Sequence, residues 1–279
     1  MSFSKTQRIL LGLGAISGVA TFYHSNNNKN KAHASWTTSY EPATNAKWDE
    51  NWDRRLPKYP KHTTKNLSEK QENKINEERE SVKPKASRHL IMIRHGQYNL
   101  SGTSDEHRVL TKIGRVQAAY TGKRLKELGF PYTEMIKSTM TRAQETGHII
   151  SESLPNVPVK NCDLLREGAP IPPEPPLGRY RPELYQFFQD GSRIEAGFRK
   201  YFYRAQPSQE NDTYTLLVCH ANVIRYFVCR ALQFPAEAWL RLSLNHASIT
   251  WITITPSGRC ILRVLGDSGH MSPDLITTT

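Results

Sequence analysis

Two short apolar runs, each followed directly by a histidine, constrain the fold of this chain more than any other feature. Residues 89–94 (HLIMIR) lead into His95, and residues 214–219 (YTLLVC) lead into His220. Runs of this length that end at a turn are typical of buried strands. In α/β sheets, ligands bind beyond the carboxyl ends of such strands. Both histidines are therefore candidates for a functional site.

Segments with helical spacing alternate with these strands. The pattern over residues 111–128 ends at Gly129 and Pro131, and it predicts an amphipathic helix. The other expected elements are helices at 141–151, 184–203 and 221–232, a short strand at 135–136, a proline-rich loop at 170–176, and a hairpin of strands 248–254 and 259–265. Strands that alternate with helices predict an α/β fold, here a three-layer α/β/α sandwich.

The chain is strongly basic, with a formal net charge of +12 and a pI of about 9.6. Such a charge suits nucleic acid, an anionic membrane surface or a phosphorylated substrate. The sequence has no zinc-finger spacing, no RNP-like aromatic motif and no block of basic residues, so nucleic acid is not an expected partner. The cysteines form no C-x-x-C pair, and we expect them to be buried thiols, free of disulfides and metals. They are Cys162, Cys219, Cys229 and Cys260.

The first forty residues contain no acidic side chain, and they include an uncharged, mostly apolar run over residues 9–23. This run is shorter than the roughly 20 residues of a full membrane span. A secretory signal, a mitochondrial signal and an uncleaved anchor are all compatible with it. The basic, serine-containing, acid-free start favours mitochondria. We therefore expect residues 1–28 to be a membrane anchor or a mitochondrial targeting segment.

Residues 29–87 have few large apolar side chains and scattered prolines, so we expect a flexible linker that is partly helical at 68–80. One island in this linker, residues 48–53 (WDENWD), departs from that composition. If the segment is helical, its two tryptophans lie on one face, because they are four residues apart. Tryptophans in a polar tether are expected to dock on a surface, either that of their own following domain, residues 88–279, or that of a partner.

The residue types near the strand ends suit phosphoryl transfer without a metal. A neutral imidazole such as His95 can attack phosphorus directly, while cationic donors hold the oxygens as charge redistributes. Arg94 and Arg142 can bind phosphate bidentately, and His220 can donate to a phosphate oxygen. A leaving alkoxide needs a proton, and Glu167 is the best candidate to supply it. No metal or other cofactor is expected, because the sequence shows no cluster of metal ligands.

Four motifs at these positions resemble the histidine phosphatase (phosphoglycerate mutase-like) superfamily. They are residues 90–96 (LIMIRHG), 110–118 (LTKIGRVQA), 138–146 (STMTRAQET) and 219–222 (CHAN). The resemblance spans residues from about 89 to 265, and it implies the sandwich fold of that superfamily. It also implies that His95 is the nucleophile and forms phosphohistidine, with Glu167 as acid and base. The implied phosphate pocket consists of Arg94, His95, Arg142 and His220.

Three segments also resemble one branch of this superfamily, the mitochondrial serine/threonine protein phosphatases. These segments are residues 48–53 (WDENWD), 165–170 (LREGAP) and 219–226 (CHANVIRY). The resemblance implies phosphoprotein substrates, an anchor in the outer or inner mitochondrial membrane, and links to apoptosis signal-regulating kinase and to mitochondrial dynamics. It further implies that a tryptophan motif assembles dimers into larger oligomers and activates catalysis. The residues of this motif are Trp48, Asp49, Asn51, Trp52 and Asp53.

Two other functions remain open from the sequence. The first is a phosphoglycerate-type mutase or small-molecule phosphatase. Tyr98 argues against it, because metabolic mutases of the superfamily carry Ser or Thr at this position, and residues 88–279 leave little room for a substrate-covering insertion. The second is a membrane-tethered scaffold that binds phosphorylated partners without turning them over. The presence of every catalytic residue type argues against a scaffold alone.

Overall fold

The computed structural model describes residues 47–56, 69–178 and 180–278. The expected membrane anchor, residues 1–28, and much of the expected linker lie outside the described residues. Within the described part of the chain, no helix is both long enough and apolar enough to cross a membrane. The anchor therefore stays a prediction from the sequence.

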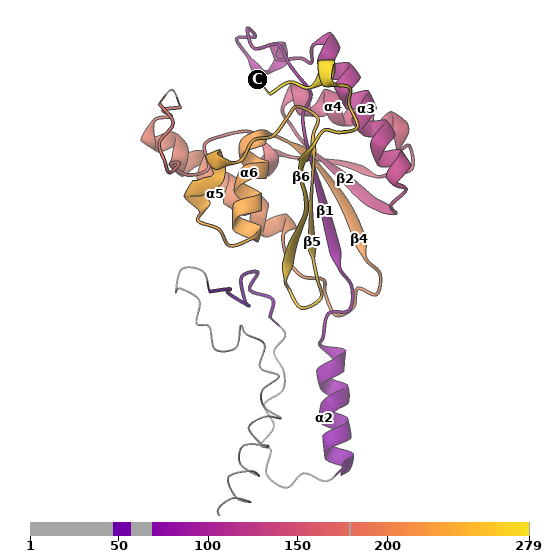
Figure 1. The fold of residues 1–279 in the computed structure, drawn as a ribbon. Coiled ribbons are helices and arrows are strands. Elements are labelled where there is room, and N and C mark those ends of the chain that lie inside the picture. The colour runs from indigo at the N-terminus through magenta and orange to yellow at the C-terminus, as the bar shows by residue number, and fades with distance from the viewer. Residues whose placement is uncertain (1–46, 57–68, 179, 279) are drawn as a thin grey trace, which may run out of the picture. The chain divides into compact units, whose positions relative to one another are not determined.

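A six-stranded sheet forms the centre of the domain (Figure 1). Across the sheet, the strands are β3 (Val159–Cys162), β2 (Tyr132–Ser138), β4 (Thr213–Cys219), β1 (Arg88–Arg94), β5 (Ile249–Ile254) and β6 (Cys260–Asp267). The first four strands pair in parallel, and β5 and β6 continue the sheet in antiparallel pairing. Because β1 and β4 are neighbours, with Arg94 opposite Cys219, the residues that follow them emerge side by side.

Helices cover both faces of this sheet (Figure 1). The two faces are covered by α3 (Lys112–Leu128) with α4 (Thr141–Ser153), and by α5 (Leu184–Tyr201) with α6 (Ala221–Ala231). Alternate residues of a strand point to opposite faces, and β1 follows this rule. Leu90 and Met92 pack in one core with α5 and α6, whereas Ile91 and Ile93 pack in the other with α3 and α4. The expected three-layer α/β/α sandwich is confirmed.

Several expected elements differ in extent from those observed. The strand expected at 135–136 runs over the whole of Tyr132–Ser138, and the hairpin strands are Ile249–Ile254 and Cys260–Asp267. Strand β3 falls where a strand without assigned bounds was expected, ahead of the loop that holds Glu167. It lies at the edge of the sheet, and three of its four residues are exposed, so it lacks the apolar pattern that marks a buried strand.

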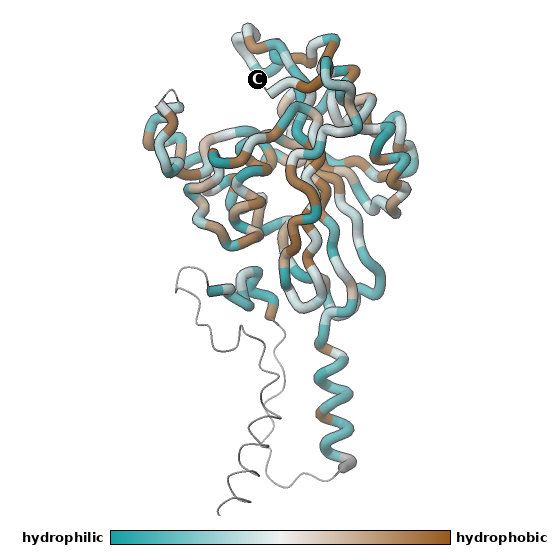
Figure 2. Tube along the Cα trace, in the orientation of Figure 1, coloured by the Kyte–Doolittle hydropathy of each residue, from teal (hydrophilic) through white to brown (hydrophobic). Residues whose placement is uncertain are grey.

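The remaining helical elements are short or polar. Helix α2 (Glu69–Ser81) falls where a partly helical linker was expected, and Figure 2 shows it as almost entirely hydrophilic. Four 3-10 turns complete the described secondary structure: η3 (Asp105–His107), η4 (Asp163–Leu165), η5 (Ala236–Arg241) and η6 (Pro273–Leu275). Turn η3 and the segment after η6 both reach the candidate active site.

The tryptophan motif docks on the domain of its own chain. The indole Nε1 of Trp52 donates to the Gly258 carbonyl at 2.8 Å, and only 6% of this residue is exposed. Asp53 accepts from Nε of Arg204 at 2.9 Å, in an ion pair whose two side chains are both buried. Of the two surfaces expected for the tryptophans, Trp52 therefore uses the intramolecular one, and assembly through the motif stays a prediction.

The motif is a turn, so the condition under which its two tryptophans would share one helix face is not met. The Asp49 carboxylate accepts from the backbone N–H of Asn51, and the Asp53 carboxylate accepts from that of Arg55. Such bonds from a side chain to the backbone two residues later compete with helical hydrogen bonding. The two tryptophans are thus not placed by a helical repeat.

The four cysteines are all buried and free of disulfides, as the sequence predicts. Burial raises the pKa of the Cys229 thiol to about 11 and that of Cys260 to about 12. Both groups therefore remain neutral thiols at physiological pH.

Candidate active site

The nucleophile expected from the sequence, His95, is buried at the end of β1. Its backbone N–H donates to the Cys219 carbonyl at 3.0 Å, which joins the ends of β1 and β4. Its ring Nδ1 lies 2.8 Å from the Gly96 carbonyl, which can only accept, so Nδ1 carries the proton. The lone pair of Nε2 is then available for attack. Burial, followed by the effects of His220, Arg142 and Arg94, lowers the pKa of His95 well below its usual value, so the ring is neutral.

Arg142 places its guanidinium directly on this nitrogen. Its Nε donates to Nε2 of His95 at 3.3 Å, and its Cζ lies 4.7 Å from the centre of the Tyr98 ring. The side chain comes from the first turn of α4, where Asp105 of η3 holds it. One carboxylate oxygen of Asp105 lies 3.5 Å from Nη1 of Arg142, and the other accepts from the backbone N–H of Thr141 at 3.1 Å. Asp105 thus caps α4 and aligns Arg142 at the same time.

The terminal nitrogens of Arg94 are held by two backbone carbonyls and one imidazole. Its Nη1 donates to the carbonyls of Leu244 and Thr278, and its Nη2 lies 3.1 Å from Nε2 of His246. Burial and the Arg94 charge lower the pKa of His246 to about 3, so this ring is neutral and accepts. The Nε of Arg94 is buried and has no partner among the described residues. This donor is left for a ligand.

His220 follows β4, and its ring centre lies 5.1 Å from that of His95. Its Nε2 lies 2.8 Å from the Ser138 hydroxyl, which also accepts from the backbone N–H of Met140. In the tautomer in which this hydroxyl donates to Nε2 of His220, the imidazole proton lies on Nδ1. That Nδ1 is buried and unpartnered within the described part of the chain. His220, like Arg94, therefore keeps one donor free.

Glu167 lies in the loop after η4, between α4 and α5. Burial raises the pKa of its carboxyl group, and the charges of Arg142 and Arg94 oppose the rise. Its backbone N–H lies 3.3 Å from Sδ of Met140, and its carbonyl accepts from Nη2 of Arg193 at 3.0 Å. A carboxyl group whose pKa is raised in this way suits an exchange of protons with a substrate.

The structure therefore brings the five predicted residues together. They are Arg94, His95, Arg142, Glu167 and His220. The set provides one neutral nucleophilic nitrogen, free donors from an arginine and a histidine, a guanidinium on the nucleophile, and one carboxyl group. Within the residues that the structure describes, no group of three side chains is arranged to hold a metal ion. The arrangement can transfer a phosphoryl group to a histidine.

Sequence reasoning missed the residues that orient this set. Asp105, Ser138 and His246 were not assigned, and Tyr98 was noted only as a departure from mutases. Each acts through a contact between elements far apart in the chain, such as that of Asp105 with the first turn of α4. Ser138 stands in one of the four superfamily motifs, so its position could have been singled out, but its partner could not.

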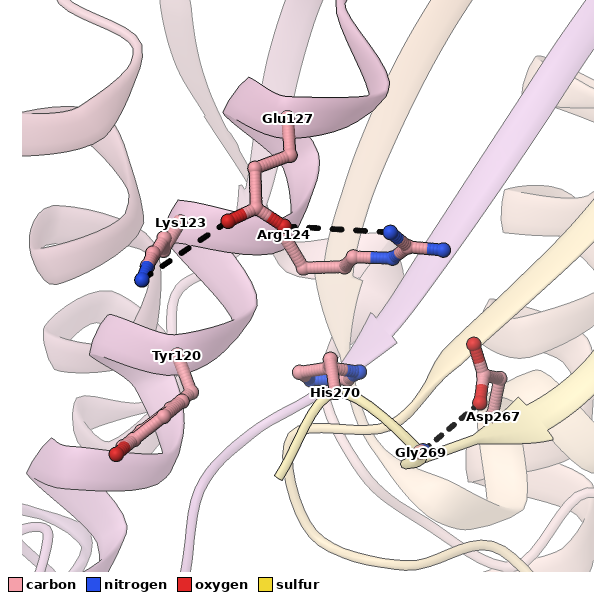
Figure 3. Close-up of a pocket in the computed structure, with 7 residues that line it drawn as sticks. All are labelled: Tyr120, Lys123, Arg124, Glu127, Asp267, Gly269 and His270. Atoms are coloured by element: carbon pink, nitrogen blue, oxygen red, sulfur yellow. Dashed lines mark hydrogen bonds and ion pairs between the residues drawn. The ribbon is translucent and has the colours of Figure 1, made fainter. Parts of the chain in front are cut away.

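A separate polar cavity of about 400 Å³ lies between α3 and the turn after β6 (Figure 3). It is lined by Tyr120, Lys123, Arg124, Glu127, Asp267, Gly269 and His270. His270 has its Nε2 3.0 Å from the Thr121 hydroxyl, which donates to the Ala247 carbonyl. The lining shares no residue with the candidate active site.

Known proteins share both the sequence and the fold. The sequence model of the histidine phosphatase superfamily (branch 1) matches residues 90–170 and 187–267. The chain is 56% identical over 271 residues to "Serine/threonine-protein phosphatase Pgam5, mitochondrial" of Drosophila pseudoobscura pseudoobscura, covering 95% of this chain and 93% of the relative. It is 51% identical over 278 residues to the protein of the same name from Drosophila melanogaster, covering 98% and 96%. A solved structure named mycobacterial hydrolase 2 shares the fold, with a TM-score of 0.51 at 21% identity over 68% of this chain and 94% of that one.

Proposed function

Because this chain belongs to the histidine phosphatase superfamily, we propose that it is a mitochondrial serine/threonine protein phosphatase that works through a phosphohistidine at His95. One observation carries the proposal. The neutral His95 ring directs Nε2 at a guanidinium 3.3 Å away, in a pocket where Arg94 and His220 each keep a buried donor free. The names of relatives at 51% and 56% identity support the substrate class and the compartment.

In the first step, Nε2 of His95 attacks the phosphorus of phosphoserine or phosphothreonine. The bond between nitrogen and phosphorus forms as the ester bond to the side-chain oxygen breaks. Glu167 gives its proton to that leaving oxygen and becomes a carboxylate. Arg142 moves its hydrogen bond from His95 to a phosphate oxygen, and Arg94 and His220 contribute their free donors.

In the second step, the Glu167 carboxylate takes a proton from water, and the water oxygen attacks the phosphohistidine. The nitrogen–phosphorus bond breaks, inorganic phosphate leaves, and Glu167 is protonated again. His95 returns to its neutral form. The cycle balances with water as the only co-reactant and is proposed to be independent of metals and cofactors.

The cellular setting proposed for this enzyme rests on the sequence and on the relatives. The acid-free, basic start with its apolar run supports an anchor at residues 1–28 in a mitochondrial membrane, outer or inner. The motif Trp48, Asp49, Asn51, Trp52 and Asp53 is proposed to assemble dimers into larger oligomers. Phosphoproteins, with apoptosis signal-regulating kinase among the partners implied by resemblance, are the proposed targets, which places the enzyme in kinase signalling and mitochondrial homeostasis.

Turnover of a phosphoserine peptide by the full chain tests this proposal. We expect His95→Ala to abolish release of inorganic phosphate, and His148→Ala, which changes an exposed histidine of α4, to leave it intact. Activity should also survive EDTA. A near-normal rate in His95→Ala, or a loss in EDTA that a divalent ion restores, would contradict the proposal. Interconversion of phosphoglycerates at a rate above that of peptide hydrolysis would favour a mutase instead.

A further inference from the structure

Helix α6 holds an arginine that the proposed reaction leaves without a role. Arg225 lies in the second turn of the helix that follows His220, and its Nε is buried with no hydrogen-bond partner among the described residues. A buried donor without a partner is unfavourable unless something else uses it. Three other nitrogens are in this condition among the described residues: those of Arg94 and His220 are assigned to phosphate in the proposed reaction, and Nδ1 of His270 belongs to the separate cavity. This condition alone does not assign Arg225 to the active site, but its contacts lead to the loop that carries Glu167.

Asn222 connects Arg225 to the loop that carries the proposed acid. Its Oδ1 accepts from Nη1 of Arg225 at 3.3 Å, and its Nδ2 donates to the Gly168 carbonyl at 3.1 Å. The backbone N–H of Gly168 then donates to Oε1 of Glu167 at 3.3 Å. A continuous path of contacts thus runs from the Arg225 guanidinium to the Glu167 carboxyl group.

Several charged or titratable groups surround Glu167. They are Arg94 of β1, Arg142 of α4, Arg193 of α5, Arg225 of α6, and Tyr180 in the segment before α5. Arg94 and Arg142 are assigned to phosphate, and Arg193 is paired with Asp190 at 2.9 Å. Arg225 is the remaining cation in this set, and the attraction between its charge and Glu167 is felt by both groups.

We propose that Arg225 is a positioning residue for Glu167. Together with Asn222, it holds the carboxyl group on the leaving-group side of the phosphate and stabilises the carboxylate that remains once the proton has moved to the leaving oxygen. Arg225 itself neither gains nor loses a proton, and the bonds that form and break are those of the first step of the proposed reaction. This inference rests on the proposed function, since it requires Glu167 to be the acid.

Two substrates with different leaving groups separate this role from a structural one. A serine alkoxide needs the proton of Glu167, whereas the nitrophenolate of p-nitrophenyl phosphate leaves without one. The ratio kcat/KM reports the steps through release of this leaving group. At a pH low enough for Glu167 to be protonated in both proteins, we expect Arg225→Met to lower kcat/KM for a phosphoserine peptide by about tenfold, the effect of about one pKa unit, and to leave the value for p-nitrophenyl phosphate nearly unchanged.

The dependence on pH gives a second reading of the same variant. In a plot of kcat/KM for the peptide against pH, the alkaline limb marks the loss of the proton from Glu167. Loss of a cation raises the pKa of a nearby carboxyl group, so this limb should move to higher pH in Arg225→Met. Arg225→Lys keeps the charge and should keep the limb in place. Arg230→Met is the matched control, because Arg230 lies on the same helix but pairs with Glu195 at 3.1 Å. It should leave the limb unmoved.

Three results for Arg225→Met would each overturn the inference: equal losses of kcat/KM on both substrates, an alkaline limb that does not move, or an unchanged kcat/KM for the peptide. If Arg225→Met does not give a folded domain by circular dichroism, Asn222→Ala takes its place and should show the same substrate-selective loss. Glu167→Gln tests the underlying function separately. If Glu167→Gln lowers kcat/KM equally for both substrates, or for neither, then Glu167 is not the acid, whatever the Arg225 variants show.

Discussion

The Ser138 hydroxyl lies 2.8 Å from Nε2 of His220, and both side chains are completely buried. The contact joins the end of β2 to the residue after β4, two strands that are neighbours in the sheet. A hydroxyl that donates to Nε2 keeps the imidazole proton of His220 on Nδ1, and this is the tautomer that the proposed reaction requires, because the phosphate oxygen needs a donor there.

Removal of this hydroxyl should therefore weaken catalysis. In Ser138→Ala, Nε2 of His220 loses its partner, which costs about 1–3 kcal/mol for a buried polar group, and the proton is free to move to Nε2. We expect kcat/KM for a phosphopeptide to fall by about tenfold, and nitrogen NMR to show a changed tautomer at His220. Ser192→Ala, which removes an exposed hydroxyl of α5, is the control. An unchanged tautomer with full activity would refute this role.

Two substitutions of Asp105 distinguish the effect of its contact with the Thr141 N–H from that of its contact with Arg142. Asp105→Asn keeps an oxygen that can accept from the Thr141 N–H, but it loses the charge that faces Arg142. We expect a several-fold higher KM with little change in stability. Asp105→Ala should also lose the helix cap, with about 1 kcal/mol less stability to urea. Equal KM values in wild type and Asp105→Asn would show that Arg142 does not depend on this carboxylate.

His246 should make stability depend on pH. Its pKa is lowered to about 3 in the folded domain, whereas an unfolded histidine titrates near 6.5. Between these values the unfolded state binds more protons, so the free energy of unfolding should fall as pH drops below about 6.5. His246→Gln should make that decline shallower in urea titrations at several pH values. His148→Gln, at an exposed site, should not. Equal slopes in all three proteins would contradict the assignment.

The tryptophan motif should contribute strongly to the stability of the domain that it covers. Trp52→Ala empties a buried site, which typically costs about 3–5 kcal/mol, and Asp53→Ala leaves the buried Arg204 charge unpaired at a similar cost. Leu56→Ala, at an exposed position, is the control. Sedimentation of variants that remain folded tests the proposed assembly. A stability loss below about 1 kcal/mol for Trp52→Ala would show that the docked arrangement is not maintained in solution.

The two histidines that follow buried strands could be predicted from the sequence. A buried strand has an apolar run of residues, and the run stops where the strand ends in a turn. Parallel pairing of β1 with β4 then brings His95 and His220 together without further information. Arg142 and Glu167 were recognised mainly through motifs, since one arginine on a helix and one glutamate in a loop carry no pattern of their own. Asp105, His246 and Arg225 act through contacts across the fold, and neither spacing nor hydrophobic periodicity records such contacts.

The covalent intermediate is the central claim, and trapping it is the most direct measurement. Glu167→Gln should still accept a phosphoryl group from p-nitrophenyl phosphate, which needs no acid, but should hydrolyse it slowly for want of a base. After an alkaline quench, which preserves phosphohistidine, peptide mass spectrometry should place the phosphoryl group on His95 and on no other residue. Phosphate on a different side chain, or steady turnover with His95 unmodified at every time point, would contradict the account.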